Sequence, residues 1–190
     1  MNIAERKRAI RRTVTAAIAG LSSEVRRASD AAICDAVRAL PGYMKAEQLL
    51  AYWPLADEVD VRAALFTAVE AGKAVFLPVT HERSIVFRRW QPQVRMATSA
   101  LGVQEPVSGE GPANVASAVL VPGRAFGTAR HRLGRGGGFY DRVWRDLERF
   151  RPRIGVGYCC QVLAEVPHDE HDSVVDVLVC ERGVVSDSTE

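Results

Sequence analysis

Short apolar segments alternate along this chain with longer amphipathic ones, and this alternation limits the folds open to it. Buried strands are predicted by the apolar runs "QLLAYWP", "AVFLPV", "ASAVLVPG", "RIGVGY" and "VVDVLVC". "SIVFRRW" adds a strand with an alternating face. Strands of this length between helices are typical of a layered α/β domain with a mostly parallel sheet.

Helical periodicity fills the segments between the strands. One helical face is formed near the N-terminus by Ile10, Val14, Ala17 and Leu21, at spacings of four, three and four. Lys7 and Arg11 share another face because they are four residues apart. Ser22 is placed to cap a second helix, which Pro41 and Gly42 should end.

The remaining elements complete the predicted order. "DEVDVRAALFTAVEAGK" predicts a helix with Val61, Leu65, Ala68 and Val69 inward, closed by Gly72. "MATSALGVQEPVSGEGPAN" predicts a loop, and a last helix is expected over Tyr140 to Phe150. We therefore predict a three-layer αβα, Rossmann-like single domain over residues 1–190, with residues 185–190 frayed.

Composition excludes several classes of protein. The length of 190 residues fits one domain, and a formal net charge of only +2 is low for a nucleic-acid-binding protein. No apolar run approaches the roughly 18 residues that span a bilayer. Four cysteines without a C-x-x-C pair predict reduced thiols in a cytoplasmic protein. The Arg-rich N-terminus is interpreted as a docked helix and not as a transit peptide.

The segment "HRLGRGGGFYDRVW" lies between a buried strand and a predicted helix. Glycines let backbone N–H groups approach a phosphate, and the following helix adds its positive end. Arg132 and Arg135 could bind phosphate oxygens, and Asp141 could bind Mg²⁺. The motif is neither a Walker loop nor G-x-G-x-x-G. Phosphate binding and a flexible connector with solvated arginines both remain open on these grounds.

The longer stretch "VLVPGRAFGTARHRLGRGGGFYDR" resembles the signature of the 5-formyltetrahydrofolate cyclo-ligase family, also called methenyltetrahydrofolate synthetases. The resemblance covers nearly the whole chain. It includes Lys7, Ile10 and Arg11 near the N-terminus and "LS" at Leu21 and Ser22. Further matching segments are "DEVD", "GK" followed by "LP", "GVQEP" and the late "EHDSVVD".

The resemblance implies an ATP-dependent, Mg²⁺-requiring ligase of one-carbon metabolism that acts on 5-formyltetrahydrofolate. In the family, ATP phosphorylates the formyl oxygen, N10 attacks the activated carbon, and loss of phosphate closes the 5,10-methenyl bridge. Such a reaction needs positioning and charge neutralisation more than a covalent nucleophile. The chain offers cations, a glycine cradle and carboxylates for this purpose.

The resemblance also implies the site residues. For ATP they are Lys7, Arg11, Arg132, Gly134, Arg135, Gly136, Gly137, Gly138, Phe139 and Tyr140. For the folate substrate they are Trp53, Glu58, Arg135, Gly136, Gly137, Gly138 and Phe139. Asp141 and Asp172 are the implied Mg²⁺ ligands, and Arg135 and Asp141 the implied catalytic residues.

Each implied role has a plainer alternative. Lys7 and Arg11 could form a solvated basic face, Glu58 could be an acid at a helix N-terminus, and Trp53 could pack in the core. His168 and His171 are spaced three apart, unlike helical zinc ligands, and are interpreted as surface residues.

Several positions depart from the family pattern; besides those that follow, Val61 and Cys180 replace frequent threonines and Gly127 replaces an aspartate. Gly137 stands where some members carry a lysine, and Phe139 replaces the first of two tyrosines. An ATP-binding paralogue with another substrate and, more remotely, an RNA-binding module remain alternatives. The expected partners are ATP and 5-formyltetrahydrofolate, without nucleic acid or membrane, in a monomer or weak homodimer.

Overall fold

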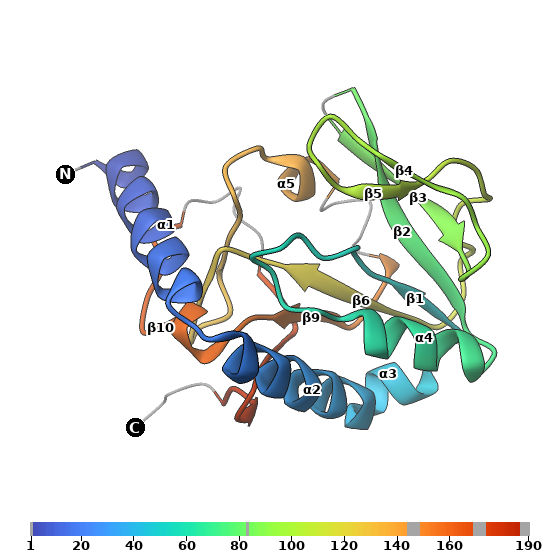
Figure 1. The fold of residues 1–190 in the computed structure, drawn as a ribbon, viewed down its shortest axis with the longest axis horizontal. Coiled ribbons are helices and arrows are strands. Elements are labelled where there is room, and N and C mark those ends of the chain that lie inside the picture. The colour runs from blue at the N-terminus through green and yellow to red at the C-terminus, as the bar shows by residue number, and fades with distance from the viewer. Residues whose placement is uncertain (1, 83, 144–148, 169–173, 187–190) are drawn as a thin grey trace.

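The computed structural model describes residues 2–82, 84–143, 149–168 and 174–186. Its centre is a seven-stranded sheet in the order β12-β11-β9-β6-β1-β2-β3 (Figure 1). The strands in that order are β12 (Gly183–Val184), β11 (Val177–Cys180), β9 (Arg153–Val156), β6 (Ser117–Pro122), β1 (Gln48–Leu50), β2 (Ala74–His81) and β3 (Ser84–Trp90). Neighbours from β11 to β2 pair in parallel, and the edge strands β12 and β3 pair antiparallel. The predicted mostly parallel sheet is confirmed.

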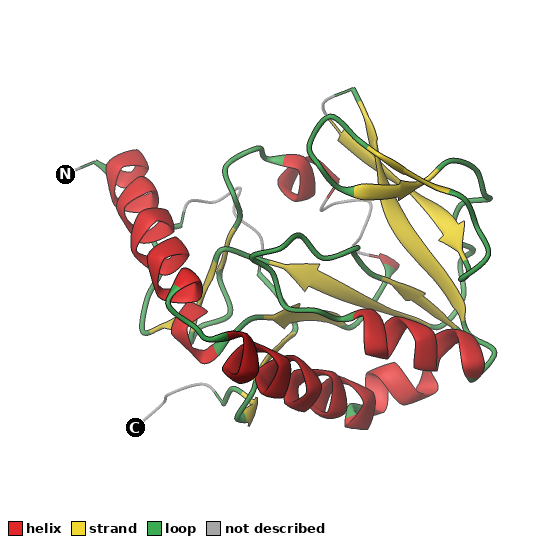
Figure 2. Ribbon diagram, viewed as in Figure 1, coloured by secondary structure: helices red, strands yellow, loops and turns green. Residues whose placement is uncertain are grey.

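Helices cover both faces of this sheet. They are α1 (Ile3–Ala19), α2 (Ser23–Ala39), α3 (Pro41–Lys45), α4 (Arg62–Glu70) and α5 (Phe139–Val143). Alternate strand residues enter two separate cores, because side chains of a strand point to opposite faces. Leu49 packs with Ile33 of α2 and Leu65 of α4, whereas Leu50 packs with Val143 of α5. Figure 2 shows α2, α3 and α4 along one side of the sheet and α5 on the other, which confirms the three-layer prediction.

The first helices begin and end as their sequences predict. The Ser22 hydroxyl accepts a hydrogen bond from the Val25 N–H at 3.1 Å and caps α2. Pro41 follows the end of α2 and opens the short α3, which the periodicity had not predicted. Gly72 has a φ of +80°, the left-handed conformation expected just after α4.

Two local predictions were wrong. The helix expected from "DEVD" onward begins only at Arg62, because Asp60 and Glu58 accept hydrogen bonds from backbone N–H groups and fold this segment into turns. The stretch expected to be a loop contains an antiparallel hairpin of β4 (Met96–Thr98) and β5 (Gln104–Pro106), which turns at Gly102 with a φ of +76°. Strands of three residues are too short for alternation to reveal them.

A second small sheet carries the glycine-rich segment. Its strands are β10 (Val162–Leu163), β7 (Ala125–Gly127) and β8 (Arg132–Leu133), none of which the sequence patterns indicated. β8 leads through the glycines into α5. The helix predicted over Tyr140 to Phe150 is confirmed in its first turn; residues 144–148 lie outside the described part of the chain.

The segment expected to be frayed, residues 185–190, is described only as far as residue 186. Val185 donates its N–H to the Leu178 carbonyl at 2.8 Å, and residues 187–190 lie outside the described range. Among the described helices, none combines the length and apolar character needed to cross a bilayer. All four cysteines are free thiols.

Candidate active site

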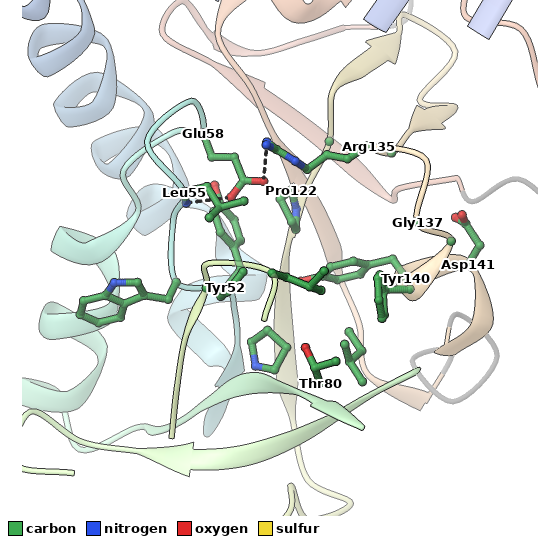
Figure 3. Close-up of a pocket in the computed structure, with 18 of the residues that line it drawn as sticks. Tyr52, Leu55, Glu58, Thr80, Pro122, Arg135, Gly137, Tyr140 and Asp141 are labelled. Carbon is green, nitrogen blue, oxygen red and sulfur yellow. Dashed lines mark hydrogen bonds and ion pairs between the residues drawn. The ribbon is translucent and has the colours of Figure 1, made fainter. Parts of the chain in front are cut away.

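A cavity of about 320 Å³ lies where β1 and β6 reach their carboxyl ends. Its size is typical of a small-molecule site. Strand β2, the β4–β5 hairpin and the glycine-rich segment form its other walls (Figure 3). Its polar or aromatic lining residues include Tyr52, Trp53, Glu58, Thr80, Glu105, Arg132, Arg135, Phe139, Tyr140 and Asp141. The position agrees with the rule that α/β sheets bind ligands beyond the carboxyl ends of their strands.

The glycine loop runs from Gly134 to Gly138 and has little room for side chains. Gly136 and Gly138 have φ values of +105° and +66°, which favour glycine. A Cβ at Gly134 would lie 2.9 Å from a guanidinium nitrogen of Arg132. Gly137 and Gly138 line the cavity directly. The loop therefore exposes its backbone beside a buried cation, which is the arrangement that phosphate binding requires.

Helix α1 reaches the same loop from the far end of the chain. The Arg11 Nε donates to the Gly134 carbonyl at 2.8 Å, and Lys7 lies one helical turn earlier. Neither Lys7, Arg11 nor Gly136 lines the cavity itself. Arg11 therefore contacts the glycine loop from outside the cavity.

Arg132 is the most deeply buried cation of the cavity, with its side chain 6% exposed. Its Nε donates to the Pro122 carbonyl at 2.7 Å, and its Nη1 lies 3.1 Å from Asp141 Oδ1. The guanidinium carbon lies 5.0 Å from the centre of the Tyr140 ring. Burial lowers the pKa of Arg132, although Asp141 acts in the opposite direction. An arginine remains charged under such a shift, so the cavity has a fixed positive wall.

Glu58 provides a buried negative group in the same cavity. Its side chain is 11% exposed, and its Oε2 accepts a hydrogen bond from the Leu55 N–H at 3.0 Å. Its Oε1 lies 3.5 Å from Arg135 Nη1 (Figure 3). Burial raises the pKa of Glu58, while the Leu55 N–H and Arg135 partly oppose the shift. A desolvated carboxylate of this kind favours a ligand that donates hydrogen bonds.

Aromatic rings complete the walls. Trp53 lines the cavity and makes an edge contact with Trp90 at a centroid distance of 5.6 Å. Phe139 also lines the cavity, and Arg142 lies 5.1 Å over its ring. The Tyr140 hydroxyl is buried and has no hydrogen-bond partner within the described chain. Since buried polar groups are normally paired, this hydroxyl is available to a bound molecule.

Arginine–carboxylate pairs hold the glycine loop against the "DEVD" segment. Asp57 accepts hydrogen bonds from Arg124 and from Arg135, each at 2.7 Å. Arg124 is 5% exposed, whereas the side chain of Arg135 is 43% exposed. Burial alone would raise the pKa of Asp57, but the hydrogen bonds from Arg135 and Arg124 outweigh burial and lower it. Asp57 therefore joins three segments that form one cavity.

We expect Asp57→Asn to lower the free energy of unfolding by about 1–3 kcal/mol at neutral pH, because it leaves the buried Arg124 without a counter-charge. The loss should shrink as the pH falls below 3.8, the ordinary pKa of Asp57. The pKa of this carboxyl is lowered in the native protein, and once the carboxyl is protonated there, the native protein lacks the same charge that the variant lacks. Chemical denaturation of both proteins across this pH range measures the difference.

Asp35→Asn is the matched control, since Asp35 pairs with Arg38 on the exposed surface of α2. Its effect should stay below about 0.5 kcal/mol. Equal losses in the two variants would show that the Asp57 network does not stabilise the cavity.

The sequence patterns missed one wall of the cavity. Leu101, Val103 and Glu105 enter it from the β4–β5 hairpin, in the stretch expected to be a loop. The Glu105 carboxylate accepts hydrogen bonds from the Thr80 N–H at 3.0 Å and from the Thr80 hydroxyl at 2.7 Å. Val103 and Glu105 are two residues apart and share one strand face, but a pair of residues is too short a signal to distinguish a strand from a loop.

Other candidates lie elsewhere. Gln161 does not line the cavity; its side-chain nitrogen donates to the Gly123 and Arg124 carbonyls and its oxygen accepts from the Tyr158 N–H. Asp172 and His171 lie outside the described residues. His168 is exposed, as expected of a surface residue, and its ring stacks on His131 at 3.6 Å.

The fold and the cavity define an α/β protein with a glycine loop and a buried arginine beside an acidic and aromatic pocket. Residues 3–181 match the 5-formyltetrahydrofolate cyclo-ligase family. The chain belongs to this family of ligases.

Relatives and solved structures agree with this assignment. The 5-formyltetrahydrofolate cyclo-ligase of Haemophilus influenzae is 31% identical over 144 residues, which cover 71% of this chain and 76% of the relative. The corresponding protein of Escherichia coli K12 is 28% identical over 146 residues, covering 73% and 80%. The NMR structure of Aquifex aeolicus 5,10-methenyltetrahydrofolate synthetase superimposes with a TM-score of 0.82 at 33% identity, covering 97% of this chain and 94% of that one.

Proposed function

We propose that the protein converts 5-formyltetrahydrofolate to 5,10-methenyltetrahydrofolate with hydrolysis of ATP to ADP and phosphate. The family assignment supports the reaction. The observation that carries the proposal is one cavity lined by two chemically different groups, a buried Glu58 and a glycine loop beside the buried Arg132. The carboxylate suits a flat heterocycle that donates hydrogen bonds, and the loop suits a phosphate.

The folate is proposed to bind with its pterin at Glu58. A pterin presents an amino group and a ring N–H, which a carboxylate can accept as a pair. Trp53 gives this cavity an apolar wall, and the unpartnered Tyr140 hydroxyl offers a further hydrogen bond. Phe139 keeps a ring at the position where the family pattern has a tyrosine, so it can pack against the ligand without a hydroxyl.

The ATP phosphates are proposed to lie along the glycine loop. Gly134, Gly137 and Gly138 line the cavity with bare backbone, and Arg132 provides a fixed charge. Arg11 reaches the loop from α1, and Lys7 lies one helical turn earlier; both are proposed to bind phosphate oxygens that extend past Gly136. Backbone N–H groups and guanidinium groups are both strong donors to phosphate.

Arg135 is proposed to change partners when the ligands bind. In the structure Arg135 contacts Asp57 and Glu58, both in the "DEVD" segment. A pterin on Glu58 would occupy one of the carboxylates that Arg135 contacts, and a phosphate on the loop would bring new negative charge beside this exposed guanidinium. Arg135 would then stabilise the charge on the transferring phosphoryl group, and N10 would attack the activated formyl carbon with loss of phosphate.

Mg²⁺ is part of the proposal because the donor set fits it. The Asp141 carboxylate is 37% exposed and lines the cavity beside the loop. Mg²⁺ prefers one or two carboxylates together with phosphate oxygens and water, and it would neutralise phosphate charge. Asp172 is the second proposed ligand and can be tested by substitution.

The function is tested by incubating the protein with ATP, Mg²⁺ and 5-formyltetrahydrofolate and following the absorbance of the methenyl product. Product formation that requires both ATP and the folate is expected. An ATPase or ATP-binding protein that ignores 5-formyltetrahydrofolate would instead be a paralogue with another substrate. RNA affinity with a steep salt dependence would support the remote RNA-binding alternative. We further propose a cytoplasmic monomer or weak homodimer.

Glu58→Gln should weaken folate use far more than ATP use. Loss of a charge-assisted hydrogen bond costs about 1.5–3 kcal/mol, or roughly 10- to 100-fold in kcat/KM for the folate. The melting temperature should not fall at neutral pH. Because the pKa of Glu58 is raised in the native protein, the ionised carboxylate destabilises the folded state, and a neutral glutamine removes this destabilisation. Steady-state kinetics with each substrate varied and a thermal melt measure these effects.

Glu47→Gln, at an exposed glutamate outside the cavity, is the control and should leave both kinetic constants unchanged. Unchanged folate KM and kcat in Glu58→Gln would remove Glu58 from the substrate site.

A further inference from the structure

Two cysteines meet at the edge of the sheet, outside the cavity. Cys180 is the last residue of β11, and Cys159 opens the 3₁₀ turn η2 (Cys159–Gln161) that follows β9. Because β9 and β11 are parallel neighbours, their carboxyl ends lie side by side. The two Sγ atoms are 3.0 Å apart. Neither cysteine lines the cavity, so the reaction proposed above leaves this pair without a role.

A carboxylate completes the cluster. Glu181 directly follows Cys180, and its Oε2 accepts a hydrogen bond from the Cys159 N–H at 2.7 Å. The two sulfur atoms and a carboxylate oxygen lie within 4.8 Å of one another. The neighbouring Cys160 is not part of this group.

We propose that Cys159, Cys180 and Glu181 bind a thiophilic divalent cation, for which Zn²⁺ is the best chemical match. Zinc binds thiolates at about 2.3 Å and carboxylate oxygens at about 2.0–2.2 Å, with tetrahedral geometry. Two sulfurs on one such ion lie about 3.8 Å apart, so the present pair would separate by less than ~1 Å. Water would fill the fourth position. Mg²⁺ prefers oxygen ligands, so this cluster discriminates against the metal proposed for the cavity.

The chemistry of the three ligands suits a dication, because two sulfur atoms and a carboxylate oxygen converge on one point. A bound dication removes the repulsion among the three ligands. It replaces the two thiol protons, which are released to solvent as the two metal–sulfur bonds form.

The cation would connect the turn after β9 to the end of β11. That turn includes Gln161, whose side chain holds the Gly123 carbonyl at 2.8 Å, and Gly123 lines the cavity. The ion is therefore expected to stabilise the sheet edge behind the cavity without taking part in chemistry. Binding to the native state alone raises the melting temperature with metal concentration.

Cobalt(II) is the probe that tests the site. The full-length protein is reduced with a phosphine, freed of metal and titrated with Co²⁺ in the presence of excess Mg²⁺. One equivalent should bind with release of about two protons per ion at neutral pH, and with thiolate-to-cobalt charge-transfer bands and the intense visible bands of tetrahedral geometry. Zn²⁺ should then displace the cobalt without further proton release. Binding without these bands, or displacement by Mg²⁺, would overturn the proposal.

Variants assign the ligands. Cys159→Ser and Cys180→Ser should each reduce or abolish the charge-transfer bands, while Cys160→Ser should retain them. Glu181→Gln keeps both thiols and should weaken zinc binding about tenfold or more, which covers the case in which a cysteine variant folds poorly. Equal losses in Cys160→Ser and Cys159→Ser would contradict the assignment. So would a native Cys159–Cys180 disulfide whose reduction yields a protein that binds no cobalt.

Discussion

Gly136→Val should abolish turnover and weaken ATP binding at least about 100-fold while the protein still folds. Gly136 lies at the turn of the glycine loop, with a φ of +105°. A Cβ there would meet only the Arg11 guanidinium, at an ordinary contact distance of 3.6 Å. The loop therefore has space for a side chain at this position. The branched valine would instead occupy the region where a phosphate must approach the backbone.

Gly183→Val is the control that separates backbone strain from the loss of ATP binding. Gly183 has a φ of +103°, almost the same as Gly136, and a Cβ there meets nothing within 4 Å. Both variants should lose a similar amount of stability, about 1–3 kcal/mol, because valine is strained at such angles. Only Gly136→Val should lose ATP affinity.

The measurements are calorimetric titration with a non-hydrolysable ATP analogue and a thermal melt of each variant. Gly136→Ala provides a smaller substitution if the valine variant folds poorly, and it should still weaken ATP binding. Normal ATP affinity in a folded Gly136→Val would mean that the loop is a connector and not a phosphate cradle.

The sequence predicted the sheet because each long strand carries its own signal. Residues Ser117–Pro122 are buried along their whole length, so the continuous apolar run was sufficient to identify a central strand. The hairpin containing Glu105 could not be predicted, since its strands have three residues and are stabilised by contacts with β2 and β3. Elements that depend on tertiary contacts leave little trace in local sequence.

The candidate site was likewise only partly predictable from the sequence. The glycine loop and Glu58 could be proposed from the sequence, the first from its glycines and the second only through the family resemblance. The ion pair of Asp57 with Arg124 joins residues 67 positions apart, and no local pattern could indicate it. The meeting of Cys159 with Cys180 follows from the pairing of β9 with β11, which the sequence also does not state.

Asp141→Asn should reduce activity at least about 100-fold at the Mg²⁺ concentration that suffices for the native enzyme. Asp141 lies in the first turn of α5, lines the cavity and pairs with Arg132. Three roles are thus possible for one carboxylate: it can favour the helix, neutralise Arg132 or bind the metal. Each role predicts a different measurable change.

The helix role alone predicts a loss of stability of about 1 kcal/mol or less with an unchanged Mg²⁺ requirement. Glu24→Gln, at an exposed acid in the first turn of α2, is the matched control for it. The Arg132 role predicts a larger fall in melting temperature and altered ATP binding even without Mg²⁺. The metal role predicts that half-maximal activity requires about tenfold or more Mg²⁺, with ATP binding in its absence nearly unchanged.

We expect the Mg²⁺ shift together with a moderate loss of stability, because asparagine keeps an oxygen acceptor for Arg132 but loses the charge. Asp172→Asn should raise the Mg²⁺ requirement in the same way. If both carboxylates bind one ion, the free-energy change of the double variant should be much smaller than the sum of the two single changes. The second substitution then acts on a metal site that the first has already removed. Additive effects, or an Mg²⁺ requirement that moves in neither single variant, would exclude a shared ion and leave Asp141 as the partner of Arg132.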